Sequence, residues 1–160
     1  MDVDGVLNPY PVCPDGFTEY DFFPEDDEPV RLAAIHREWL HNLADSFTMV
    51  WATGWGQDAN QILCPHFGLP ELPVISFPPA PFDPAAKVHS IAAFTAAKVP
   101  ALADFATEHA VAWVDDVVTQ EARQWARARS YPTLLVEVDH RIGLTRDDVD
   151  SLLAWRLSLG

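Results

Sequence analysis

Apolar residues gather in short, nearly continuous runs along this chain, and polar stretches separate them. Four of these runs have the length of buried strands: 47–53, 74–77, 110–114 and 133–138. A strand that is apolar at successive positions buries both of its faces, as strands do in a parallel sheet that helices cover on both sides. The runs therefore predict such a sheet.

Amphipathic segments lie between the apolar runs. Their periodicity predicts helices over 29–43, 56–63, 84–98 and 118–128, and a last helix that begins after Thr145. Thr145 suits the N-cap of that helix, and two acidic residues follow it in the first turn. Strands that alternate with helices predict an α/β fold, a Rossmann-like three-layer α/β/α sandwich with a mostly parallel sheet.

Two proline-rich stretches, 8–28 and 64–84, show no clear periodicity. They predict long surface connections, which are often functional. Neither stretch is long enough to form a domain, so we expect a single domain over 1–160 without a large cap domain. Residues 9–28 suffice only for a flap over a site.

The charge of the chain limits its partners. The chain holds 24 Asp and Glu against 10 Lys and Arg, a formal net charge of −14. A field of this sign disfavours binding of nucleic acid through a basic surface, whereas a metal ion held by carboxylates fits it. No apolar run approaches the ~20 residues of a membrane span, and no signal peptide precedes the first acidic residues. We therefore expect a cytoplasmic protein that does not enter membranes.

Candidate catalytic residues lie at three points where an extended segment ends. Asp2 and Asp4 stand two residues apart on one side of such a segment, and Gly5 lets the chain turn sharply behind them. Thr53 ends one apolar run, and Asp115-Asp116 follow another. Because an open parallel sheet binds its ligands at the carboxyl ends of the strands, we expect these side chains to converge.

These residue types suit phosphoryl transfer assisted by a metal ion. Carboxylates from two strand ends, with a backbone carbonyl, form the hard-oxygen site that magnesium prefers. Such an ion relieves the repulsion between clustered acids and screens a phosphate from an attacking carboxylate. One aspartate then attacks phosphorus while the other serves as general acid and base. A hydroxyl such as Thr53 and an ammonium such as Lys87 would hold the phosphoryl oxygens.

Taken in order, these residues resemble the motifs of the haloacid dehalogenase-like (HAD) hydrolase superfamily. Residues 2–8, Asp-Val-Asp-Gly-Val-Leu-Asn, look like its DxDGxxN signature. Thr53 looks like the second motif, Lys87 like the third and Asp115-Asp116 like the acidic fourth.

The resemblance implies a role for each residue. Asp2 would form an aspartyl-phosphate intermediate, and Asp4 would protonate the leaving group. Magnesium would bind the Asp2 carboxylate, the Asp4 backbone carbonyl and one acid of the fourth motif, with Asp116 preferred over Asp115.

The phosphoryl group, on the same resemblance, would be bound by Thr53 and Lys87. Lys98 ranks below Lys87 for this role, because it falls near the end of a predicted helix rather than at its start.

A narrower resemblance links segments 51–55 and 113–116 to small, capless HAD domains associated with RNA-repair proteins. One feature departs from the superfamily, in which an apolar central strand leads into the first aspartate: here only Met1 precedes Asp2. Either the start lies upstream or the protein lacks most of its central strand. A missing strand would leave a gap in the sheet, with backbone groups unpaired and apolar faces uncovered.

The sequence thus predicts a magnesium-dependent phosphomonoesterase. A site without a cap suits a phosphate that protrudes from a larger molecule, such as a nucleic-acid end, or a small phosphomonoester closed in by a second subunit. The alternative is a catalytically inactive or regulatory module, which the short segment before Asp2 favours. Dehalogenation in this superfamily needs neither magnesium nor an acid such as Asp4. The presence of Asp4 and Asp116 therefore disfavours it.

Overall fold

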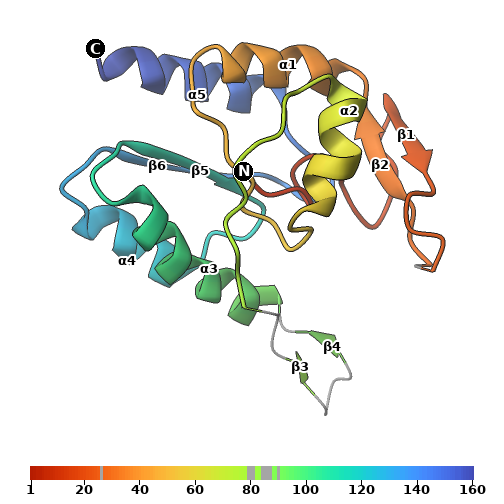
Figure 1. Cartoon of the computed structure of the whole chain (residues 1–160), viewed down its shortest axis with the longest axis horizontal. Helices are drawn as coiled ribbons and strands as arrows, with labels where there is room; N and C mark the ends of the chain where they lie inside the picture. Colours follow the sequence, from red (N-terminus) through yellow and green to blue (C-terminus); the bar gives the residue numbers. More distant parts are fainter. Residues whose placement is uncertain (26, 79–81, 84–87, 90) are drawn as a thin grey trace.

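The computed structural model describes residues 1–160 except 26, 79–81, 84–87 and 90. Its elements, in chain order, are β1 (Phe17–Tyr20), β2 (Val30–Ala33), α1 (Ile35–Ala44), the π-helix η1 (Ala59–Leu63), α2 (Cys64–Phe67), β3 (Phe82–Asp83), β4 (Val88–His89), α3 (Ile91–Ala106), β5 (Val111–Asp115), α4 (Gln120–Ala128), β6 (Thr133–Glu137) and α5 (Arg146–Ser158). Helices α1 and α5 lie on one side of β5 and β6, and α3 and α4 lie on the other (Figure 1).

A parallel arrangement of extended segments forms the centre of the molecule. β5 and β6 pair in parallel along their whole length. On the other side of β5, the Asp2 N–H donates to the Val114 carbonyl at 3.0 Å. The Met1 ammonium donates to the Val50 carbonyl at 2.8 Å, and the Met1 carbonyl accepts from the Ala52 N–H at 2.8 Å. Met1 and Asp2 therefore occupy the place of a strand between β5 and the segment that contains Val50 and Ala52.

A second parallel contact continues the sheet beyond that segment, because Trp51 forms an isolated bridge with Val74. The order across the sheet is thus Val74, Trp51, Met1–Asp2, β5 and β6. The predicted α/β class with parallel strands is confirmed.

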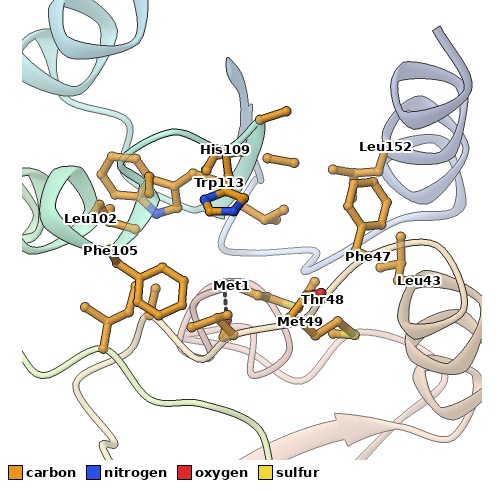
Figure 2. Close-up of a pocket in the computed structure, with 18 residues that line it drawn as sticks. Met1, Leu43, Phe47, Thr48, Met49, Leu102, Phe105, His109, Trp113 and Leu152 are labelled. Carbon is orange, nitrogen blue, oxygen red and sulfur yellow. Dashed lines mark hydrogen bonds between the residues drawn. The ribbon is translucent and has the colours of Figure 1, made fainter. Parts of the chain in front are cut away.

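Two of the four predicted strands, 110–114 and 133–138, are confirmed as β5 and β6 within one residue at each end. The strands predicted over 47–53 and 74–77 are too long, since the pairing there is limited to the bridge between Trp51 and Val74 and the bonds of Val50 and Ala52 to Met1. Residues 47–50 run along an apolar cavity instead of along a described strand (Figure 2). Without a neighbouring backbone in register, an apolar run does not become a ladder.

The helix predicted over 29–43 begins only at Ile35, because residues 30–33 form β2. β2 is buried along its whole length and pairs antiparallel with β1. The stretch 8–28 is therefore more than a connection or a flap, since it supplies the first strand of a hairpin. Pairing with a preceding segment overrides the helical periodicity, which a local pattern does not reveal.

The other helices vary in how closely they follow the prediction. The helix predicted over 84–98 is α3, which ends only at Ala106; residues 84–87 and 90 lie outside the described part of the chain. The short helix predicted over 56–63 is η1, continued by α2, and that over 118–128 is α4. α5 follows Thr145 in a capping box: the Thr145 hydroxyl accepts from the Asp148 N–H, and the Asp148 carboxylate accepts from the Thr145 N–H.

Two apolar clusters cover the two faces of the central sheet. On one face Val114 packs with residues of α1 and α5, among them Leu43 and Leu152. On the other face Trp113 packs with residues of α3 and α4, among them Leu102. Successive residues of β5 thus point into different clusters, which explains why this strand is apolar without alternation. Among the described helices, none has both the length and the hydrophobicity that a membrane span needs.

A buried side chain of η1 joins the segment that contains Trp51 to the segment that leads into Val74. Asn60 is 8 % exposed, and its Oδ1 accepts from the Trp51 indole N–H at 3.1 Å and from the Leu72 N–H at 3.0 Å. Its Nδ2 donates to the Leu72 carbonyl at 2.9 Å. Asn60 therefore holds the segment that leads into Thr53.

We predict that Asn60→Ala lowers the free energy of unfolding by about 3 kcal/mol, because it leaves the Trp51 indole N–H and both backbone groups of Leu72 without this partner. Urea denaturation measures the loss. The control is Asp58→Ala, at an exposed carboxylate that makes no capping hydrogen bond, which should change stability by less than about 0.5 kcal/mol. Equal effects of the two substitutions would contradict this role of Asn60.

Candidate active site

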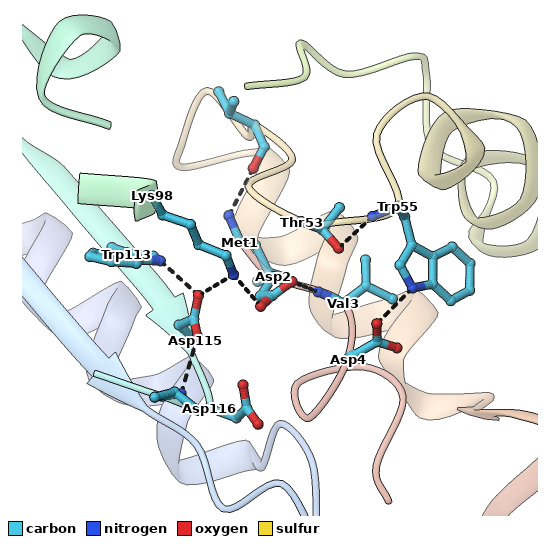
Figure 3. A network of polar contacts seen from close by, with 12 residues as sticks. Met1, Asp2, Val3, Asp4, Thr53, Trp55, Lys98, Trp113, Asp115 and Asp116 are labelled. Atoms are coloured by element: carbon cyan, nitrogen blue, oxygen red, sulfur yellow. Dashed lines mark hydrogen bonds and ion pairs between the residues drawn. The ribbon is translucent and has the colours of Figure 1, made fainter. Parts of the chain in front are cut away.

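Two segment ends meet at one edge of the sheet and place acidic side chains together (Figure 3). Asp2 comes from the central position, and Asp115 and Asp116 come from the end of β5. Carboxylate oxygens of these three residues lie within 4.8 Å of one another. A cavity of about 630 Å³ opens beside them, and Asp2, Asp4 and Asp116 line it.

A buried lysine lies between two of these acids. Lys98 Nζ is 2.5 Å from Asp2 Oδ2 and 2.8 Å from Asp115 Oδ2, and the Lys98 side chain is 1 % exposed. Burial alone would lower the pKa of Lys98, but the charges of Asp2 and Asp115 outweigh it, so the pKa is raised. The ammonium therefore stays charged and compensates two carboxylates that would otherwise repel each other.

The carboxylate of Asp115 makes its hydrogen bonds inside the protein and does not face the cavity. It is wholly buried, and besides Lys98 it accepts from the Trp113 indole N–H at 3.2 Å and from the Val117 N–H at 3.1 Å. Burial raises the pKa of Asp115 to about 7, the charge of Asp2 adds to this rise, and Lys98 opposes it.

Asp116, in contrast, lines the cavity. Its Oδ2 accepts from the Tyr10 hydroxyl at 2.7 Å. Gly5 lies against it with φ +74°, and a Cβ on Gly5 would come within 2.3 Å of Asp116 Cγ. The glycine of the first motif is thus required both by the turn and by the space that Asp116 fills.

Asp4 lies on the exposed side of the cavity, with both carboxylate oxygens held. Asn8 Nδ2 donates to Oδ1 at 2.8 Å, and the Trp55 indole N–H donates to Oδ2 at 3.0 Å. Although one edge of Asp4 meets solvent, the surrounding protein desolvates its carboxyl and raises the pKa. A raised pKa favours a carboxyl that can hold and donate a proton.

The remaining predicted residues have different outcomes. Thr53 is 2 % exposed and lies beside Asp2, and its hydroxyl accepts from the Trp55 N–H at 3.3 Å (Figure 3). Lys87 lies outside the described residues. The reason for ranking Lys98 lower was wrong, because Lys98 lies in the middle of α3 rather than near a helix end.

Sequence reasoning did not identify Tyr10. It lies in the stretch 8–28, which the sequence predicts to be a surface connection, and it is 106 positions from Asp116, whose carboxylate it contacts. Its ring also stacks on His140, with centroids 4.7 Å apart. No spacing rule relates these residues; a tyrosine soon after the first motif is the one available signal.

The site has the donors that a divalent metal ion requires. Three carboxylates lie together, and among the described residues the Lys98 ammonium is paired with two of them, Asp2 and Asp115, so the cluster has an excess of negative charge when ionised. Its donors are oxygens, which magnesium prefers. Asp2 and Asp116 line the cavity from which an ion would enter. The residues therefore fit a magnesium ion.

Fold and site together define an α/β protein with a cluster of aspartates at the carboxyl edge of a parallel sheet, which is a phosphohydrolase-type architecture. Residues 1–149 match the family described as the HAD domain in Swiss Army Knife RNA repair proteins, so the chain belongs to this family. Its HAD membership, predicted from the motifs, is thereby confirmed. Neither a curated protein nor a solved structure matches the chain.

We predict that Lys98→Met destabilises the metal-free protein by about 3–5 kcal/mol near pH 8, because two buried carboxylates lose their counter-charge. The loss should shrink toward pH 4. A carboxyl whose folded-state pKa is raised contributes stability below its unfolded pKa and loses it as pH rises. Asp115 is such a carboxyl, with a pKa of about 7, and removing Lys98 raises that pKa further.

Urea denaturation in EDTA at several pH values measures this effect. The control is Arg146→Met, which removes an exposed ion pair with Asp150 and should cost less than about 0.5 kcal/mol at every pH. A Lys98→Met loss that does not depend on pH would contradict the charge argument and leave only lost packing.

Proposed function

We propose that this chain is a magnesium-dependent phosphomonoesterase that acts through an aspartyl-phosphate on Asp2, with Asp4 as general acid and base. The observation that carries the proposal is the convergence of Asp2, Asp115 and Asp116 within 4.8 Å, with the ammonium of Lys98 against two of them. A structural ion pair needs one acid for each base, whereas this cluster has an excess of carboxylates beside an open cavity.

The first half-reaction forms a bond from an Asp2 oxygen to phosphorus and breaks the bond from phosphorus to the leaving oxygen. Asp4 gives its proton to that oxygen, so the leaving group departs as an alcohol. In the second half-reaction Asp4 takes a proton from water, whose oxygen attacks phosphorus and releases inorganic phosphate and free Asp2. The raised pKa of Asp4 supports its role as the proton donor.

Asp2, Asp116 and the backbone carbonyl of Asp4 would hold the magnesium ion, with Asp115 behind them. When bound, the ion supplies positive charge that lowers the repulsion between the phosphate and the attacking carboxylate. Lys98, in place of Lys87, would contact a phosphoryl oxygen, since its Nζ lies 2.5 Å from Asp2 Oδ2. Thr53, beside Asp2, would donate its hydroxyl hydrogen to another.

The substrate we propose is a terminal phosphate on a larger molecule, such as a nucleic-acid end. The family takes its description from RNA repair proteins, and the cavity at Asp2 has a volume of about 630 Å³. The net charge of −14 argues against a basic surface for the rest of that molecule, so recognition would centre on the phosphate.

A second candidate function is an inactive or regulatory module. The observation that favours it is that both carboxylate oxygens of Asp2 are already engaged, Oδ1 by the Val3 N–H at 2.8 Å and Oδ2 by Lys98 Nζ at 2.5 Å. Metal and phosphate binding that depend on Asp2 distinguish the two functions.

We predict that beryllofluoride stabilises the protein against thermal unfolding only when magnesium is present, beyond any shift that magnesium produces alone. Beryllofluoride on a carboxylate mimics an aspartyl-phosphate, so no substrate is needed. At about 100 times its dissociation constant the ligand should add ~2.7 kcal/mol. Asp2→Asn should abolish the shift, because it removes the oxygen that beryllium binds.

The comparison is between ligand-induced shifts, so any loss of intrinsic stability in Asp2→Asn cancels. Aluminium-free buffers and a fluoride control exclude other complexes. A shift that persists in Asp2→Asn, or no shift in a protein that unfolds cooperatively, would favour the inactive module.

A further prediction separates the two neighbouring acids. Asp116→Asn should weaken magnesium binding by more than the roughly 10–100-fold that loss of an outer partner costs, with little change in stability, because the Tyr10 hydroxyl can still donate to the new amide oxygen. Asp115→Asn should mainly lower stability, because Asp115 holds Lys98 and two other donors. Isothermal titration with magnesium and urea denaturation measure the two effects; the reverse pattern would exchange the two roles.

A further inference from the structure

The hydroxyl of Tyr10 holds one oxygen of an acid that we place on the metal ion. It donates to Asp116 Oδ2 at 2.7 Å, and both residues line the cavity beside Asp2. Asp116 follows β5, which is already paired with β6 along its whole length. The strand therefore does not need this hydrogen bond to stay in place, and what the bond fixes is the rotation of the Asp116 carboxylate.

Tyr10 is itself fixed by the loop that follows β6. Its N–H donates to the His140 carbonyl at 2.9 Å, and its ring stacks on the His140 imidazole, with centroids 4.7 Å apart and planes inclined by 25°. The same loop is attached to the first motif, because the Leu144 N–H donates to the Val6 carbonyl at 2.7 Å. The position of the Tyr10 hydroxyl is thus determined by contacts within the protein.

The oxygen that Tyr10 holds is also packed against the main chain. A Cβ on Gly5 would come within 2.4 Å of Asp116 Oδ2. Turning the carboxylate so that both of its oxygens face one ion would require Oδ2 to leave Tyr10 and Gly5. Asp116 therefore has one restrained oxygen, Oδ2, and its other oxygen, Oδ1, is the one that can ligate an ion without breaking these contacts.

The second carboxylate that we place on the ion is restrained in a similar way. Asp2 Oδ1 accepts from the Val3 N–H at 2.8 Å, and Asp2 Oδ2 lies 2.5 Å from Lys98 Nζ. A carboxylate oxygen that accepts a hydrogen bond has one of its lone pairs occupied. Each of the two acids therefore offers a metal ion a single oxygen more readily than a chelating pair of oxygens.

Single-oxygen ligation suits magnesium better than calcium. Magnesium requires near-ideal octahedral geometry and is usually bound by one or two carboxylates, with water molecules as the other ligands. Calcium takes 6–8 oxygens in flexible geometry and often binds a carboxylate through both oxygens. A carboxylate that cannot turn withholds the second oxygen from calcium without any cost to magnesium.

We propose that Tyr10 is a positioning residue that gives the site its preference for magnesium over calcium, because its hydroxyl restrains Asp116 to ligation through one oxygen. Since Asp116 is a metal ligand only under the proposed function, this role of Tyr10 rests on that function. Tyr10 acts through Asp116 and does not itself bind the ion.

A purely structural role of Tyr10 would have a different signature. If the hydroxyl only tied the stretch 8–28 to the end of β5, its loss would loosen the site and weaken the binding of both ions by the same factor. The ratio of the two affinities cancels such a general effect. It therefore reports on the orientation of the Asp116 carboxylate rather than on stability.

The test is Tyr10→Phe, which keeps the ring on His140 and the backbone hydrogen bond and removes only the hydroxyl. Isothermal titration of the metal-free protein with magnesium chloride and, separately, with calcium chloride measures the two affinities. Magnesium should bind at least about 10-fold more weakly, as expected for loss of a partner behind a metal ligand. Calcium should bind as well as before or more tightly, because Asp116 can now turn both oxygens toward it.

The matched control is Tyr20→Phe, which removes the same atom from β1, where the ring stacks on Phe22 with centroids 5.1 Å apart. It should leave both affinities unchanged. A second variant, His140→Leu, removes the ring on which Tyr10 stacks and should lower the ratio of magnesium to calcium affinity by a smaller factor. In the Tyr10→Phe background it should have no further effect, because the hydroxyl that it supports is gone.

The outcomes separate this role of Tyr10 from the proposed function. Equal weakening of both ions in Tyr10→Phe, an unchanged ratio, or a His140→Leu effect that persists without the hydroxyl would overturn the role of Tyr10. If the unaltered protein still binds magnesium, each of these results leaves the proposed function standing. Failure of the unaltered protein to bind magnesium at all would overturn both.

Discussion

The ammonium of Lys98 and the two carboxylates beside it determine how the rest of the molecule is arranged. These three charges are buried, and the residues that carry them come from the N-terminal segment, from α3 and from the end of β5. An uncompensated charge in such a place costs several kcal/mol, so these three segments have to meet for any of them to be stable. Assembly of the candidate site and closure of the α3 side of the sheet are therefore one event.

The first motif is held from the other side by the hairpin. Asn8 Oδ1 accepts from the Arg31 N–H at 2.7 Å, while Asn8 Nδ2 donates to Asp4. Arg31 is itself buried, and its guanidinium pairs with Glu19 and Glu28. β2 thus supports the carboxyl proposed as general acid, and an element that looked like a surface connection in the sequence becomes part of the framework of the site.

The central position of the sheet combines backbone pairing with the charge of the site. The Asp2 N–H donates to the Val114 carbonyl of β5, while Met1 bonds to Val50 and Ala52 on the other side. The Asp2 carboxylate pairs with the Lys98 ammonium, and Gly5 turns the chain behind it. The geometry of the central segment and the charge of the site are therefore coupled, because both depend on Asp2.

The sequence by itself determined the α/β class, β5, β6, the capped α5 and the set of aspartates, because apolar runs, capping patterns and short spacings are local properties. Helical periodicity over 29–43 was misleading, since β2 owes its form to a partner strand. Only the tertiary structure decided that Lys98 meets Asp2 and that Tyr10 meets Asp116. Which face of a helix covers a strand end, and which loop folds over it, depends on long-range packing that no local pattern encodes.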